Sequence, residues 1–448
     1  MKKILLWLLV LTMCVSMVAS FSLVGCKKEA APAEEVAEEA APAEEVEEAA
    51  PAEEVTPQKI TVIMPRHEMD LIGIWEQQTR EFEEETGIQV ELIQAEWEKV
   101  ADKIQVELAA SGSNYDVIEF DNSWVAKFLE ADWVIPLDDY IPAGMKEELL
   151  PGLVNTFTFD GKLYGITWNN DTRFFMYNGA MLEEAGIQEP PHTFAELVEQ
   201  TEALKEKGIS NYGWADFWPQ SQALANSHAY FLYSFGGDFF DGEGNPIFNN
   251  DAGIEALQFM VDALNDEVAD PASITYEQED AANVFYKGDT PFFLQAWPGV
   301  YSFSNDEEQS NIVGQVKVAE WIPAKSEDLQ ATLNLPEAFS ISKFSENKDA
   351  AWKFIEFMTS KEKDRERALN IGSLPIWSEL YNDAELLEMY PYWEQFGKQI
   401  LYARGLPKIT WYDEFSYILQ VEVQMALNGN KTAEEALNSI LEQIQDKL

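Results

Sequence analysis

Residues 59–120 read KITVIMPRHEMDLIGIWEQQTREFEEETGIQVELIQAEWEKVADKIQVELAASGSNYDVIEF, and strand and helix patterns alternate along them. Three short stretches, residues 59–64, 88–93 and 115–120, have the β-branched or alternating pattern of strands. Residues 70–86 and 97–110 have apolar positions at helical spacing. The order strand, helix, strand, helix, strand predicts an α/β fold with a doubly wound, parallel sheet.

In such sheets, ligands bind beyond the carboxyl ends of the strands. The loop after the first predicted strand is Pro65–Met69, and the loop after the third is Asp121–Trp124. Neither loop contains a Gly-x-Gly-x-x-Gly or a Walker motif, so the sequence gives no support for nucleotide binding. These two loops are the first places where a ligand site is expected.

Helical patterns dominate the second half of the chain, at residues 254–264, 349–360 and 413–427. Thr193 with Glu196, and Thr432 with Glu435, have the spacing of a capping box and predict two helix starts. The apolar residues 174–177 predict a further strand.

Composition excludes several classes of protein. The chain has 448 residues, enough for a sizeable core and more than one lobe. Its 80 acidic and 30 basic residues give a net charge of −50, which argues against nucleic acid binding, because that depends on Lys and Arg. The chain has only three histidines and two cysteines, so it offers too few ligands for a metal site built from nitrogen and sulfur atoms. We expect no cofactor and no metal.

The N-terminus has the pattern of a lipoprotein signal peptide over residues 1–25. Two lysines precede a short apolar stretch, residues 4–18, and small residues follow. The run Leu23-Val24-Gly25-Cys26 resembles a bacterial lipobox, whose cysteine carries the lipid after cleavage. We therefore expect lipid attachment at Cys26 and a protein anchored to a membrane at the cell surface or in the periplasm.

Residues 26–58 predict a disordered acidic linker. From Glu29 onward the segment is almost entirely Ala, Pro, Glu and Val, with no aromatic residue, so it cannot form a core. Its prolines and like charges favour an extended spacer. Without residues 1–58, the remaining chain still has 69 acidic and 26 basic residues.

Several short motifs, in this order, resemble the sugar-binding family of extracellular solute-binding proteins that serve ABC importers, the group that contains the maltose- and trehalose-binding proteins. The motifs are Phe82–Ile88, Tyr115–Val117, Phe128–Glu130, Pro136–Tyr140, Gly161–Ile166, Tyr177–Asn178, Glu184–Ile187, Phe285–Gly288, Ala350–Ile355 and Ala426–Gly429.

The resemblance implies a type II periplasmic-binding-protein fold, in which two α/β lobes close by hinge bending. The expected N-terminal lobe comprises residues 59–167 plus 296–341, and the C-terminal lobe residues 168–295 plus 342–448. Chain crossings are then expected near residues 166–168, 293–296 and 340–342. The resemblance further implies a monomer that catalyses nothing, captures a sugar and delivers it to a membrane permease.

Sugar hydroxyls pair with carboxylates, amides and Arg, and flat sugar faces pack on aromatic rings. On these grounds and on the resemblance, we expect the ligand contacts among Arg66, His67, Glu68, Asp121, Trp168, Asn169, Asp171, Arg173, Trp218, Trp297, Glu337 and Trp411.

Alternatives remain open from the sequence. Glu337 stands where many relatives have Gly-Gly and an aromatic residue, which argues against a long maltodextrin. Acidic and aromatic side chains together also suit a cationic solute such as a polyamine. Paired carboxylates with tryptophans are typical of a glycosidase as well. A surface adhesin or structural lipoprotein would bind no small molecule at all.

Overall fold

The computed structural model describes residues 58–67 and 69–448. The predicted signal peptide, the lipid-attachment residue Cys26 and linker residues 27–57 lie outside the described residues. The chain divides into two units, Met1–Val55 and Thr56–Leu448, and the fold described here is that of the second. In the described part of the chain, no helix combines the length and the apolar character that a membrane span requires.

The first sheet has five strands in the order β2-β1-β3-β11-β6. The predicted strands of the opening segment are confirmed as β1, β2 and β3, which pair in parallel. β11 then pairs antiparallel with both β3 and β6, so the sheet is mixed instead of fully parallel. The bounds are β1 Lys59–Pro65, β2 Gln89–Ala95, β3 Val117–Asp121, β6 Ile166–Asn169 and β11 Glu337–Ile341.

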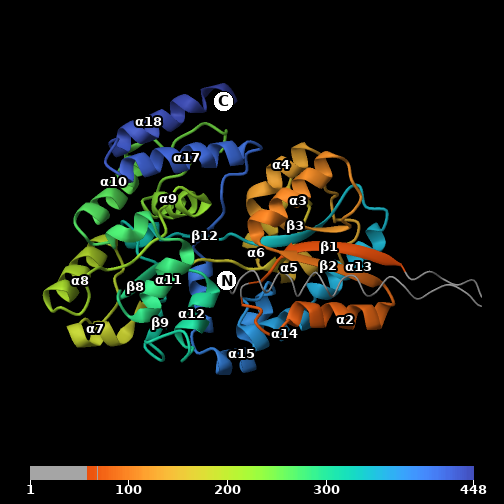
Figure 1. The fold of residues 1–448 in the computed structure, drawn as a ribbon, viewed down its shortest axis with the longest axis horizontal. Coiled ribbons are helices and arrows are strands. Elements are labelled where there is room, and N and C mark those ends of the chain that lie inside the picture. Colours follow the sequence, from red (N-terminus) through yellow and green to blue (C-terminus); the bar gives the residue numbers. More distant parts are fainter. Residues whose placement is uncertain (1–57, 68) are drawn as a thin grey trace, which may run out of the picture. The chain divides into compact units, whose positions relative to one another are not determined.

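Helices lie on both sides of this sheet, as the doubly wound prediction requires (Figure 1). α2 (Ile74–Thr86) contacts β2, and α3 (Trp97–Ala109) contacts β1 and β3. α13 (Lys348–Met358) packs against β11 and α2. The resulting core places Trp75 of α2 at the centre, fully buried.

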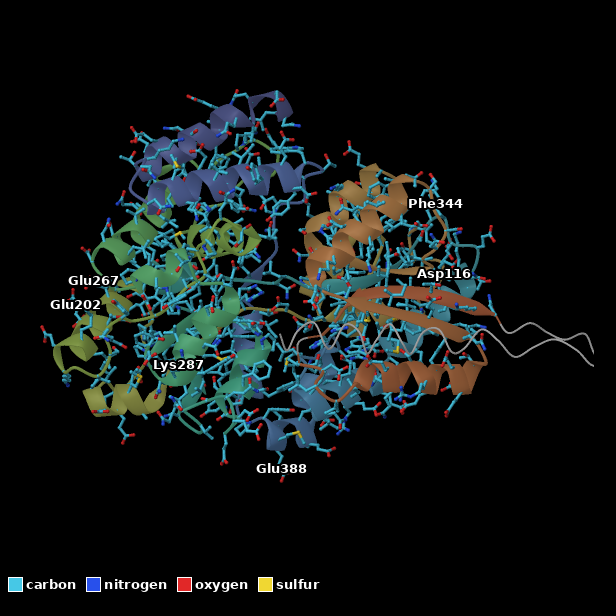
Figure 2. The ribbon with its side chains drawn as sticks, in the orientation of Figure 1. Asp116, Glu202, Glu267, Lys287, Phe344 and Glu388 are labelled. Atoms are coloured by element: carbon cyan, nitrogen blue, oxygen red, sulfur yellow. The ribbon has the colours of Figure 1, made fainter. Side chains whose placement is uncertain are left out.

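Asp116, labelled in Figure 2, fixes the start of β3. Its carboxylate accepts hydrogen bonds from the backbone N–H of Thr61 (2.9 Å), the Ser345 hydroxyl (2.6 Å) and the Asn347 amide (3.2 Å). One buried side chain therefore joins β1, β3 and the loop that follows β11, which sets the positions of the strand ends at the opposite edge.

The second sheet has three antiparallel strands in the order β8-β7-β9, and the predicted strand at 174–177 is confirmed as β7. Helices α9, α10, α17 and α18 pack on one another around a second hydrophobic core. Both predicted capping boxes are present, at α8 and α18. The bounds are β7 Phe174–Asn178, β8 Phe292–Ala296, β9 Val316–Val318, α8 Phe194–Glu206, α9 Gln222–Ser234, α10 Asp251–Asn265, α17 Tyr412–Leu427 and α18 Ala433–Gln443.

The remaining elements are shorter or connect the sheets. They are α4 Val125–Glu130, α5 Met145–Glu148, α6 Pro151–Thr156, β4 Thr158–Phe159, β5 Lys162–Leu163, α7 Gly179–Ala185, α11 Gln278–Lys287, α12 Pro298–Ser304, β10 Thr332–Leu333, α14 Lys361–Ile371, α15 Ala384–Met389, α16 Trp393–Ile400, β12 Ala403–Arg404, and the 3₁₀ turns η1 Asn122–Trp124, η2 Pro271–Ile274, η3 Glu327–Leu329, η4 Ser378–Asn382 and η5 Gln445–Lys447.

The structure assigns some segments to sheets differently from the expected lobes. β8 is followed by β9, and both pair with β7, so residues 293–296 lie within the second sheet and are not a crossing between sheets. Residues 170–173 connect β6 to β7, and residues 334–336 precede β11, so both segments lie between the two sheets. α13, expected in the C-terminal lobe, packs on the first sheet.

Candidate functional site

The site is built from the strand ends of the first sheet, beginning with the carboxyl end of β3. Asp121 is the last residue of this strand and is 5% exposed. Its carboxylate accepts hydrogen bonds from the backbone N–H of Ser123 (2.8 Å) and from the Ser123 hydroxyl. It thereby caps η1, the turn that continues the chain from β3 into α4.

β11 brings a second carboxylate to the same edge. Glu337, its first residue, lies directly opposite Asp121 on one side and Asn169 of β6 on the other. The Asn169 amide donates a hydrogen bond of 2.8 Å to Glu337 Oε2. Three residues expected to contact a ligand, from three separate parts of the sequence, are thus neighbours at one sheet edge.

Glu119 is a fourth member of this group and was not among the expected residues. It lies two residues before Asp121 on β3, so both side chains lie on the same face of the strand. One carboxylate oxygen from each of Glu119, Asp121 and Glu337 lies within 4.8 Å of the others. The sequence signal that could have revealed it is an acidic residue at an otherwise apolar position of a buried strand.

The surroundings of Glu119 favour its neutral form. The side chain is fully buried, and Trp168 Nε1 donates a hydrogen bond of 2.8 Å to its Oε2. Burial raises the pKa of Glu119 well above its usual value, and the charges of Glu337 and Asp121 raise it further. The hydrogen bond from Trp168 lowers the pKa but is the smallest of these effects.

Trp168 was expected to present its ring to a ligand, but its ring is enclosed by protein. It is 1% exposed, stacks on Phe339 at 5.7 Å and meets the edge of Trp75 at 5.1 Å between ring centroids. No part of the ring is available to a solute in this structure. Trp168 contributes to the site through its indole N–H, which holds Glu119.

The expected site residues in the loop after β1 differ in their exposure and contacts. Arg66 is exposed, and its backbone N–H donates to Ala95. His67 is 5% exposed, its Nδ1 accepts a hydrogen bond from the backbone N–H of Met69 (3.2 Å), and its ring lies 5.8 Å from that of Trp168. The third residue expected here, Glu68, lies outside the described residues.

The connection between β6 and β7 carries a second polar group. Arg173 forms an ion pair of 2.8 Å with Asp171 and donates a hydrogen bond of 3.0 Å to Gln278. Its guanidinium lies 5.6 Å from the ring centroid of Trp297, which is partly buried. Asp171, Arg173 and Trp297, all expected in the site, are therefore in one cluster.

The other two expected tryptophans lie in the second hydrophobic core or at its edge. Trp218 is fully buried and donates a hydrogen bond of 2.8 Å to the Ser227 hydroxyl, so its ring is also unavailable to a solute. Trp411 is partly buried and packs edge-on against Phe240 and Phe415. Neither contacts the carboxylate group through an interaction that the structure records.

The fold is similar to those of known binding proteins. Maltose-bound MalE3 of T. maritima superposes with a TM-score of 0.77 at 29% identity, over 87% of this chain and all of that one. An ABC transporter solute-binding protein of Thermotoga lettingae, bound to α-D-tagatose, superposes with a TM-score of 0.76 at 25% identity, over 87% of this chain and 99% of that one.

Sequence comparison agrees. A putative binding protein of Brucella abortus is 25% identical over 344 residues, which are 72% of this chain and 82% of that protein. The sequence profile of the family described as bacterial extracellular solute-binding protein matches residues 70–364, more than half of the chain. The mixed α/β fold built on a five-stranded and a three-stranded sheet, the structural similarity and this match give one conclusion: the chain belongs to the family of bacterial extracellular solute-binding proteins.

Proposed function

We propose that this protein captures a sugar or oligosaccharide between its two lobes and delivers it to the membrane permease of an ABC importer. The observation that carries the proposal is the meeting of Asp121, Asn169 and Glu337 at one sheet edge. Carboxylates and an amide at fixed positions offer the acceptors and donors that sugar hydroxyls need. The sugars bound by the two structural relatives support the same class of solute.

The proposal includes an anchor and a spacer. Lipid attachment at Cys26 would hold the protein at the membrane, and the acidic linker would let the binding unit reach the permease. We propose that the protein acts as a monomer, since the site is built within one chain.

A cationic solute such as a polyamine is the second candidate, and the three clustered carboxylates favour it. A glycosidase is the third, because paired carboxylates are its catalytic groups. Thermal unfolding of the protein with maltose, maltodextrins, tagatose and spermidine, followed by chromatography of each mixture, separates the three. We expect sugars to raise the unfolding temperature and to be recovered unchanged. An increase in the unfolding temperature with spermidine alone would establish a polyamine-binding protein. Release of shorter sugars would establish a glycosidase.

The variant Asp121→Asn tests the site. Asn can still accept the hydrogen bonds from Ser123, but it removes one charged acceptor for the solute. We expect the dissociation constant of the bound sugar to rise about tenfold to a hundredfold, from the loss of about 1.5–3 kcal/mol. Glu202→Gln removes one charge from α8 and is the matched control (Figure 2). Equal affinities of both variants would exclude Asp121 from the site.

A further inference from the structure

Glu119 has a hydrogen-bonding deficit that its ionised form cannot meet. Its Oε2 accepts the indole N–H of Trp168, whereas Oε1 is buried and accepts no hydrogen bond from any residue in the described part of the chain. A carboxylate has only acceptors, and a buried acceptor without a donor is unfavourable. A protonated carboxyl group would turn this oxygen into a donor, for which acceptors lie close by.

The neighbours of Glu119 supply acceptors and negative charge. On the sheet, the carboxylates of Asp121 and Glu337 lie within 4.8 Å. His67, in the loop after β1, lies with its ring 5.8 Å from that of Trp168. Arg367, on α14, lies with its guanidinium 4.4 Å from the ring centroid of Trp75 on α2. These two groups pack against the tryptophans and not against the Glu119 carboxyl group in the contacts described. Asp116, at the opposite end of β3, is held by Thr61, Ser345 and Asn347.

The charges of Glu337 and Asp121, in that order, are those that act on the titration of Glu119, and both favour its protonated form. Glu337 already accepts one hydrogen bond, from the Asn169 amide. A proton on Glu119 would give Glu337 a further hydrogen bond. It would also remove the repulsion of Glu119 with both Asp121 and Glu337 and leave that between Asp121 and Glu337.

We propose that Glu119 is a positioning residue of the solute site: it stays protonated and donates a hydrogen bond to Glu337, which fixes the Glu337 carboxylate for the solute. This inference rests on the proposed function for its ligand part only. It predicts that solute affinity is constant while Glu119 keeps its proton and falls as the pH rises through the pKa of Glu119.

The variant Glu119→Gln tests this role, because its amide mimics the protonated acid. The amide oxygen can accept from Trp168, while its N–H₂ donates to Glu337 at any pH. By titration calorimetry with a sugar that shifts the unfolding temperature, we expect Glu119→Gln to bind within about threefold of the wild type at pH 6 and to lose the fall at high pH. Glu119→Leu, which has no donor, should bind about tenfold more weakly at every pH.

Thermal unfolding gives a readout that needs no ligand. A carboxyl group with a raised pKa stabilises the fold in its protonated form, and this stabilisation is lost as the pH rises from the unfolded toward the folded pKa. The unfolding temperature of Glu119→Gln should therefore increase relative to the wild type as the pH rises above 4.5. If no sugar binds the wild type, the proposed function fails while this result still decides the state of Glu119.

Three outcomes would overturn the proposal. The first is a Glu119→Gln variant that keeps the pH dependence of the wild type in both measurements. The second is a Glu119→Gln variant that binds about tenfold more weakly at pH 6, since the amide would then fail to replace the acid. The third is stabilisation of the wild type but not of Glu119→Gln by calcium chloride, because a cation and not a proton would then lie among the carboxylates.

Discussion

His228, on α9, is a neutral histidine enclosed by the second hydrophobic core. The side chain is fully buried, and neither ring nitrogen has a hydrogen-bond partner among the residues that the structure describes. Burial lowers the pKa of His228 from 6.5 to about 4. The folded protein therefore binds this proton less readily than the unfolded chain does.

The sign of the resulting pH dependence follows directly. Keeping His228 neutral costs the folded state no stability above pH 6.5. As the pH falls from 6.5 toward 4, the free energy of unfolding decreases by about 3 kcal/mol in total, because the unfolded chain binds the proton and the folded protein does not. We expect His228→Leu to lose less stability than the wild type over this range, measured by urea denaturation at pH 4–7. Asn438→Ala, which removes no titratable group from the protein surface, should keep the wild-type slope. Equal slopes for His228→Leu and the wild type would contradict this account of His228.

At the residue scale, the sequence predicted that Asp121 ends a strand of the first sheet, but it did not predict which tryptophans are enclosed by protein. Asp121 lies at the end of a predicted strand, a position that local pattern can identify. Trp168 and Trp218 were expected to face a ligand but are buried. Whether an indole packs in a core or lines a surface depends on residues distant in sequence, such as Phe339 against Trp168.

At the scale of elements, local patterns predicted strands and helices to within a few residues. The predicted helix at residues 70–86 begins instead at Ile74, for a reason that the structure makes clear. Gly73 has φ 74°, outside the helical region, and the Asp70 carboxylate accepts the N–H groups of Ile74 and Trp75. Asp70 thus precedes the helix and satisfies its first donors.

Gly165 shows why one motif of the family resemblance contains glycine. A Cβ at this position would lie 2.9 Å from both Ala338 Cβ on β11 and Phe120 Cδ1 on β3. These distances are shorter than van der Waals contact, so the side chains or strands would have to move. We expect Gly165→Ala to lower the free energy of unfolding by about 1–3 kcal/mol, measured by chemical denaturation. Gly152→Ala in α6 has open space around its Cβ, so it should be neutral or slightly stabilising. Equal effects of the two substitutions would contradict the packing argument.

At the scale of the whole molecule, local sequence patterns did not predict which strands pair, and only the family resemblance grouped residues 337–341 with the opening strands. β11 lies between β3 and β6, although more than 160 residues separate it from either strand. Strands that are close in sequence usually pair, and no local pattern marks an exception. The same long-range pairing brings Glu337 to Asp121, so the complete site could only be found from the structure.

The two connections between the sheets are joined by buried amide and hydroxyl groups. Asn334 donates hydrogen bonds to Thr172 (2.7 Å) and Asn170 (3.2 Å), and Asn170 donates to the Pro375 carbonyl (3.2 Å). We expect Asn334→Ala to cost about 1–3 kcal/mol, because it leaves buried polar groups without partners. Asn438→Ala, which removes an exposed hydrogen bond from Asn249, should cost little. Chemical denaturation of both variants measures these free energies of unfolding. An Asn334→Ala variant as stable as the wild type would contradict a structural role for the network.

Titration calorimetry of the wild-type protein with maltose, tagatose and spermidine in turn, with chemical analysis of each sugar afterwards, tests the central claim most directly. The account predicts saturable binding of one sugar per chain, with the sugar recovered intact. Saturable binding of spermidine with no heat from any carbohydrate, or conversion of the sugar to products, would contradict it.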